Sequence, residues 1–252
     1  MAEAYQSALL DSPLGLAVLE RIRELGPSTL SDEELVEVAL RERMLLSIHR
    51  PDYSIIVARL KAHREELAPL AAWLAGRVRH WWQDLDREHQ VWISTADLPP
   101  SEAKLVVQLD DFSATATKPR AAFWTSTHLA RVRSPWLDWL LHGEDRRPGP
   151  FNLWSLPVTS GARVAEVHST ADWCRLVGEY PGEIREEVLH PDWRRIGERW
   201  DAVHVSAGGL IATEDQPCPA GPENCRLLGW NIESTVWLRW RFGSPTQIGR
   251  ID

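Results

Sequence analysis

The hydrophobic pattern of the chain changes at Pro99-Pro100, and this change constrains the fold more than any other feature. Before it, apolar residues recur at helical spacing; after it, they gather in short runs that are typical of strands. We therefore predict an α+β protein in two parts. Residues 1–95 are expected to form a helical N-terminal region. Residues 100–252 are expected to form an α+β domain with a mixed, mainly antiparallel β-sheet and short helices.

The N-terminal part carries recognisable helix-start signals. Ser31 and Glu34 fit a capping box, in which each side chain bonds the backbone N–H of the other residue. Prolines suit the first turn of a helix and break its later turns, so they mark further boundaries. The expected helices cover residues 13–27, 31–48 and 52–66, with one more from residue 69 onward. The pattern is typical of a small helical bundle.

The second part alternates strand-like runs with short helices. The first two runs have no helix between them, which favours a mainly antiparallel or mixed sheet over a parallel one. Residues 213–226 contain three prolines, and we expect them to form a mobile, surface-exposed loop. The expected strands are 104–109, 121–127, 163–168, 202–206 and 229–240; the expected helices are 135–141, 171–179 and 191–200.

Composition and charge exclude several classes of protein. The longest apolar runs fall far short of the roughly 20 residues that span a bilayer, and the acidic N-terminus lacks a signal-peptide pattern. Three cysteines, an odd and low number, favour a reducing compartment over a disulfide framework. The net charge of −8 argues against generic nucleic-acid binding. We expect a cytoplasmic protein with no membrane partner.

Tryptophan is the outlier of the composition. The chain has 14, and ten of them follow residue 100. Because an indole ring fills a large apolar volume, most of these rings are expected in the core. Trp124 and Trp237 are the two that we predict as walls of a ligand site, because they lie beside the most suggestive polar residues.

The familiar catalytic and cofactor motifs are absent from the sequence. It contains no GxGxxG after a strand, no GxxxxGK[ST], no HExxH and no GxSxG. Cys218 and Cys225 have the wrong spacing for a zinc knuckle, and no metal is expected.

Two strand-like segments carry candidate chemistry. In the first, Lys118 and Arg120 precede a run that ends in Thr125, Ser126 and Thr127. Alternation along a strand would point Ser126 to one face and the two threonines to the other. Serine and threonine are also common at strand ends, so a purely structural role is the alternative.

The second segment, residues 229–240, contains one carboxylate in an uncharged stretch. Asn231, Glu233 and Thr235 would share one strand face with Trp237. A carboxylate inside an apolar strand costs several kcal/mol unless it is paired or wet. Glu233 is therefore either functional or buried with a partner from elsewhere in the chain. An ion pair with Arg239 on the same strand is excluded by their separation along the strand.

Together these residues resemble the mono-ADP-ribosyltransferase superfamily over residues 100–252. Its serine-centred motif resembles Thr125-Ser126-Thr127, and its Q/E-x-E motif resembles Asn231-Ile232-Glu233. The resemblance implies a split sheet that clamps NAD, with Ser126 orienting the strand on the nicotinamide side. It implies that Glu233 bonds the ribose and stabilises the oxocarbenium-like transition state.

The same resemblance implies further roles and shows two departures. Trp124 would stack on nicotinamide, together with its neighbour Phe123. The early-strand arginine or histidine of the family is absent from residues 104–109, so Lys118 or Arg120 would hold the phosphates instead. Asn231 stands where family members carry Glu or Gln.

The leading functional hypothesis is an NAD-consuming enzyme. It would transfer ADP-ribose to a macromolecule or hydrolyse NAD, as a bacterial or phage toxin or defence factor, with a cognate regulator or antitoxin as partner. The alternatives are a non-enzymatic, tryptophan-rich binding module for a protein or small ligand, and a structural or regulatory protein that uses its helices as a partner surface.

Overall fold

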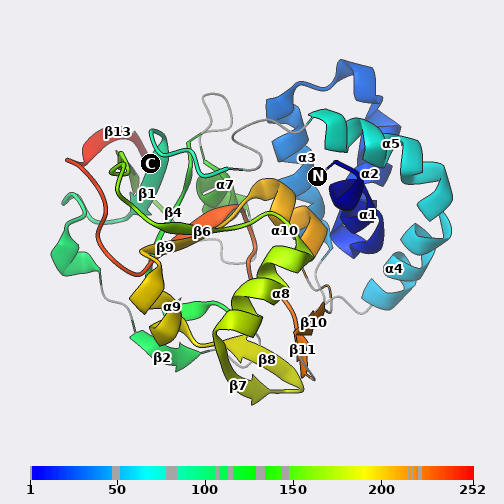
Figure 1. The fold of residues 1–252 in the computed structure, drawn as a ribbon. Helices are drawn as coiled ribbons and strands as arrows, with labels where there is room; N and C mark the ends of the chain where they lie inside the picture. Colours follow the sequence, from blue (N-terminus) through cyan, green and yellow to red (C-terminus); the bar gives the residue numbers. More distant parts are fainter. Residues whose placement is uncertain are drawn as a thin grey trace.

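The protein is an α+β molecule with a helical region packed beside a mixed sheet (Figure 1). Its computed structural model describes residues 2–46, 52–77, 84–105, 108–112, 116–128, 134–142, 148–214, 216, 218–220 and 223–252. In the view of Figure 1, helix α10 lies between the helical region and the sheet. None of the helices in these ranges has the length and apolar character that a bilayer crossing needs.

Two helices of the N-terminal region begin where the sequence signals predict. Ser12 accepts a hydrogen bond from the backbone N–H of Gly15, and the predicted capping box of Ser31 and Glu34 is present. The expected helix 52–66 is instead two helices that meet at His63, and Pro69 lies inside the second of them. The helices are α1 (Ala2–Asp11), α2 (Pro13–Leu25), α3 (Asp32–Leu45), α4 (Tyr53–Ala62) and α5 (Arg64–Arg77), with a 3-10 turn, η1 (Pro27–Thr29).

The main sheet has seven strands in the order β13-β5-β1-β4-β12-β9-β6. Neighbouring strands are antiparallel except β6 and β9, which are parallel, so the prediction of a mixed, mainly antiparallel sheet is confirmed. The strands are β1 (Gln90–Ser94), β4 (Phe123–Thr127), β5 (Phe151–Ser155), β6 (Val164–Val167), β9 (Ala202–Val205), β12 (Ser234–Trp237) and β13 (Thr246–Ile251).

Shorter elements surround this sheet. Helix α10 is buried along its whole length, and Ser206 caps its first turn. The helices are α7 (Pro135–His142), α8 (Thr170–Glu179), α9 (Trp193–Arg199) and α10 (Ala207–Thr213), with a 3-10 turn, η2 (Glu102–Lys104). Three two-stranded pairs complete the fold: β2 (Gln108–Phe112) with β3 (Pro119–Ala121), β7 (Pro181–Arg185) with β8 (Val188–Pro191), and β10 (Cys218–Ala220) with β11 (Glu223–Cys225).

Strand β1 lies near the middle of the sheet, although its residues precede the boundary that the sequence pattern predicts at 95–100. It pairs with β4 on one side and β5 on the other. Among the described residues, the strand expected over 104–109 does not join this sheet: η2 occupies its start, and β2 pairs with β3. The sheet therefore begins earlier in the chain than the apolar pattern indicates.

The expected exposed loop over 213–226 is also different in the structure. Thr213 and Cys225 are fully buried, and β10 and β11 form a hairpin within the segment. Cys174 of α8 is disulfide-bonded, whereas Cys225 is a buried thiol outside any disulfide, and burial raises its pKa to about 11. The disulfide removes the argument for a reducing compartment that rested on the cysteine count.

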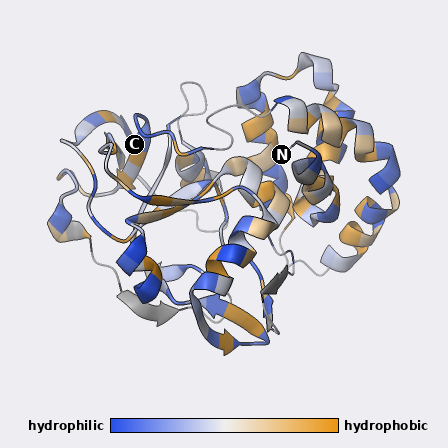
Figure 2. Cartoon of the chain, viewed as in Figure 1, coloured by the Kyte–Doolittle hydropathy of each residue, from blue (hydrophilic) through white to orange (hydrophobic). Residues whose placement is uncertain are grey.

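One hydrophobic core joins the two parts of the chain. Hydrophobic residues lie on the helical region, on α10 and on the sheet side (Figure 2). The Tyr5 hydroxyl donates to the carbonyl of Gly208 at 3.1 Å, and the Ser12 hydroxyl donates to the carbonyl of Ile211 at 2.5 Å. The helical region is thus packed against the sheet domain through α10.

The tryptophans divide between full and partial burial. Trp173, Trp193, Trp230 and Trp237 are among the largest fully buried side chains, in keeping with the predicted core role. Trp81 and Trp82 lie outside the described residues. Trp124 is only partly buried, so its ring can contact a ligand.

We predict that residues 96–252 do not fold alone. This fragment lacks β1, which leaves β4 and β5 without a shared neighbour, and it exposes the apolar faces of α10. The expected result is an insoluble fragment, or one without a cooperative thermal transition by circular dichroism.

Co-expression supplies the control for this truncation. Residues 1–77 and 84–252, made as two chains, should restore a soluble complex because their buried surfaces are complementary. A fragment 96–252 that unfolds cooperatively on its own would contradict a shared core.

Candidate functional site

The two candidate segments meet in space at the end of β4 and the start of β12. The strands are antiparallel neighbours, with Thr125 opposite Thr235. Glu233, just before β12, accepts a hydrogen bond from the backbone N–H of Thr127 at 2.9 Å. The Thr127 hydroxyl donates to the other oxygen of the same carboxylate at 2.9 Å. Only 3% of Glu233 is exposed, so this carboxylate is fixed inside the protein.

A buried histidine links Glu233 to a second carboxylate. His204 of β9 places Nε2 3.1 Å from Glu233 and Nδ1 2.6 Å from Glu166 of β6. Burial alone would lower the pKa of His204, but the charges and hydrogen bonds of Glu166 and Glu233 raise it to about 10. The imidazole is therefore protonated at neutral pH, with both ring nitrogens donating.

Glu166 is the more exposed of the two carboxylates that bond His204. Its side chain is 29% exposed, against 0% for His204. Burial disfavours its charge, yet the charge and hydrogen bond of His204 outweigh burial and lower the pKa of the Glu166 carboxyl. Two carboxylates and one imidazolium leave a net negative charge in this part of the sheet.

A polar network continues along the same sheet face. The Thr125 hydroxyl donates to Gln90 Oε1 and accepts from Trp237 Nε1 at 2.8 Å. Gln90 Nε2 donates to the Thr127 hydroxyl at 3.2 Å. Thr125, Thr127 and Trp237 thus share the Glu233 face, and all are buried. Trp237 packs against neighbouring apolar side chains here rather than lining the pocket described below.

The strand next to β4 on the side away from β12 is β1, and it contributes Gln90 to this network. The early strand taken from the sequence, residues 104–109, does not border β4 in the described structure. The described residues of β1 include no cationic side chain. The cation that bonds Glu233 in this network is His204, which comes from β9.

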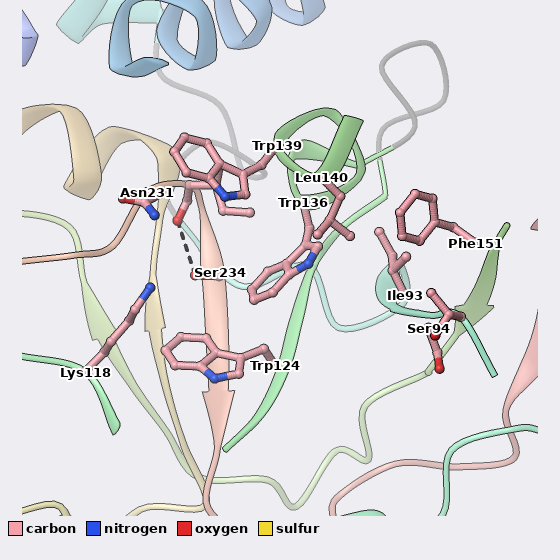
Figure 3. A pocket seen from close by; sticks show the side chains of 12 residues that line it. Ile93, Ser94, Lys118, Trp124, Trp136, Trp139, Leu140, Phe151, Asn231 and Ser234 are labelled. Atoms are coloured by element: carbon pink, nitrogen blue, oxygen red, sulfur yellow. Dashed lines mark hydrogen bonds between the residues drawn. The ribbon is translucent and has the colours of Figure 1, made fainter. Parts of the chain in front are cut away.

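A pocket of about 300 Å³ opens on the other face of the sheet (Figure 3). Trp124 and Trp136 form an aromatic wall, with ring centroids 6.1 Å apart. The ammonium of Lys118 lies 5.6 Å from the Trp124 ring centroid. The lining residues are Ile93, Ser94, Thr95, Lys118, Trp124, Trp136, Trp139, Leu140, Phe151, Asn231, Ile232 and Ser234.

The structure divides the predicted site residues between these two places. Lys118, Trp124 and Asn231 line the pocket, and Glu233 lies between two further lining residues, Ile232 and Ser234. The Glu233 carboxylate itself bonds Thr127 and His204 on the opposite face. The pocket and the carboxylate are therefore adjacent along the chain but separated by the strand.

Ser126 and Arg120 are the remaining predicted residues. The Ser126 hydroxyl is buried, bonds the Ser134 hydroxyl at 2.5 Å and accepts from the backbone N–H of Trp136 at 3.4 Å. It thereby holds the start of α7, which carries two tryptophans of the pocket. The side chain of Arg120 lies outside the described part of the structure.

Sequence reasoning missed Arg43. Its Nη2 donates to Asn231 Oδ1 at 2.9 Å and to Glu214 Oε1 at 3.1 Å. These contacts join residues separated by 171 and 188 positions, so no local pattern could reveal them. Within the described ranges no group of acidic, histidine and cysteine side chains is arranged to hold a metal ion.

No family model, curated protein or solved structure matches this chain.

We predict that His204 makes the stability of the protein fall as pH rises. Its pKa is raised from 6.5 to about 10 in the folded state, so folding retains a proton that the unfolded chain releases. The stabilisation is complete below pH 6.5 and is lost as pH rises toward 10. The difference in unfolding free energy between wild type and His204→Gln should shrink by at most about 1.4 kcal/mol per pH unit in this window.

Urea unfolding at pH 7 and pH 9 measures this difference. His89→Gln is the matched control, because His89 is an exposed histidine paired with Asp86. That variant should keep the pH dependence of the wild type. Equal pH dependence in wild type and His204→Gln would show that His204 does not hold its proton.

Proposed function

We propose that the protein binds NAD in the tryptophan-lined pocket and consumes it as an ADP-ribosyltransferase-like enzyme. One observation carries the proposal: the chain neighbours of Glu233 on both sides line the aromatic pocket. Indole faces suit a planar ring such as nicotinamide, and the Lys118 ammonium suits a phosphate. A pocket of about 300 Å³ encloses one ring system with its ribose, so the rest of the dinucleotide would extend past it.

The chemistry would use Glu233 as a negative charge beside the ribose. When the N-glycosidic bond breaks, nicotinamide leaves with the bonding electrons and positive charge develops on the ribose. A carboxylate placed beside the ribose stabilises that charge. An acceptor group of a macromolecule, or water, then attacks the ribose carbon and loses a proton. His204 and Thr127 hold the Glu233 carboxylate on the opposite face of the sheet, so it must exchange these hydrogen bonds for contact with the ribose.

The reaction requires the Glu233 carboxylate to reach the pocket side. Residues 231–233 precede the first residue of β12, so they can turn without breaking the ladder of the main sheet. Ligand contact with Asn231 and Ser234, on either side of Glu233, would favour such a turn.

A second candidate is recognition of a planar, anionic ligand without turnover. It is favoured by the position of Glu233, whose carboxylate is buried and already accepts hydrogen bonds from Thr127 and His204. In this case the charged network stabilises the sheet, and the pocket alone carries the function.

NAD titration separates these candidates, with tryptophan fluorescence reporting binding and mass spectrometry reporting nicotinamide release. We expect NAD to quench the pocket tryptophans and Lys118→Met to weaken binding about tenfold or more, because an ammonium–phosphate contact is lost. Glu233→Gln should abolish nicotinamide release while the variant still binds NAD. Lys61→Met and Glu65→Gln change exposed residues and serve as matched controls.

Each outcome decides between the candidates. Binding without release in the wild type supports the recognition module and rejects the enzyme. Release that persists in Glu233→Gln rejects the proposed role of Glu233. A wild type that neither binds nor consumes NAD refutes the NAD proposal.

A further inference from the structure

Arg43 of the helical region contacts the wall of the pocket. This residue lies in the last turn of α3, and its guanidinium bonds Asn231 of the pocket wall and Glu214 after α10. The Arg43 side chain is 13% exposed and that of Glu214 is 9% exposed. A charge-assisted contact so shielded from water is held more firmly than a surface ion pair.

The contact with Arg43 fixes the direction of the Asn231 amide. A guanidinium only donates hydrogen bonds, so the atom that faces it must be the amide oxygen. The amide nitrogen of Asn231 then points away from Arg43, and Figure 3 shows it on the side of Lys118. The described residues provide no hydrogen-bond acceptor for this nitrogen within the protein.

We propose that Arg43 is a positioning residue that makes this end of the pocket a hydrogen-bond donor. With the amide held, Asn231 Nδ2 and Lys118 Nζ both offer donors to a ligand. Such an end selects an acceptor-rich, anionic group, such as a phosphate, and disfavours a cationic one. The inference rests on the proposed binding of NAD in this pocket.

Removing the guanidinium would release the amide. Without it, the Asn231 side chain can turn over and present its carbonyl oxygen, which repels an anion. The helical region therefore contributes to ligand selection without touching the ligand. Glu214 supports this arrangement by holding the guanidinium from the other side.

A double-mutant cycle on NAD binding tests the proposal. Arg43→Met and Asn231→Ala should each raise the NAD dissociation constant roughly three- to tenfold, the effect of one lost hydrogen bond. The double variant should bind no more weakly than Asn231→Ala, because Arg43 acts through Asn231. A simple loss of positive charge would instead weaken binding equally in both backgrounds.

Two further variants keep the test independent of folding. Arg43→Lys retains the positive charge, but its shorter side chain ends before the position of Arg43 Nη2, the atom that bonds both Asn231 and Glu214, so it should bind NAD as weakly as Arg43→Met. Arg41→Met removes an exposed guanidinium from the same helix and should bind within about twofold of the wild type. A thermal unfolding curve for each variant shows that it is folded at the temperature of the NAD titration.

The outcomes distinguish this inference from the proposed function. NAD affinity unchanged in Arg43→Met and Arg43→Lys, or additive effects in the double variant, would overturn the role of Arg43 while NAD binding stands. Absence of NAD binding in the wild type would overturn the proposed function, and the inference with it.

Discussion

A buried histidine of this sheet links two carboxylates. His204 lies between Glu166 and Glu233, and Glu233 in turn holds Thr127. These contacts tie β6, β9, β12 and β4 together at one level of the sheet. Two carboxylates so close would repel each other, and burying Glu233 would cost several kcal/mol without a partner. The imidazolium removes that cost, so the neighbouring hydroxyl and amide groups can form a complete network.

This network gives the two faces of the sheet different properties. One face carries charges and hydroxyls whose hydrogen bonds are satisfied inside the protein. The other face carries Trp124 and the pocket, with polar groups at one end and apolar side chains elsewhere. Because strand residues alternate between faces, neighbouring residues such as Glu233 and Ser234 serve different surroundings. A ligand in the pocket is one strand thickness away from the charged network.

Much of this arrangement follows from periodicity in the sequence, and the rest depends on distant contacts. Strand alternation correctly predicts that Thr125 and Thr127 lie on one face of the sheet and Ser126 on the other. The capping-box pattern correctly predicts where α3 begins. Strand β1 was missed because its apolar run, residues 91–93, is short and follows Gln90, a buried polar residue that bonds Thr125. The partners of Glu233 and Asn231 come from other elements, so no local spacing could identify His204 or Arg43.

The buried position of α10 affects how the chain must fold during synthesis. Tyr5 and Ser12 bond residues that lie 203 and 199 positions later in the chain. Helices α1 to α3 therefore leave the ribosome long before the element that covers their apolar surface exists. Until α10 emerges, those helices carry unshielded hydrophobic side chains, which expose a growing chain to aggregation or chaperone capture. Completion of the shared core therefore waits until α10 has been translated.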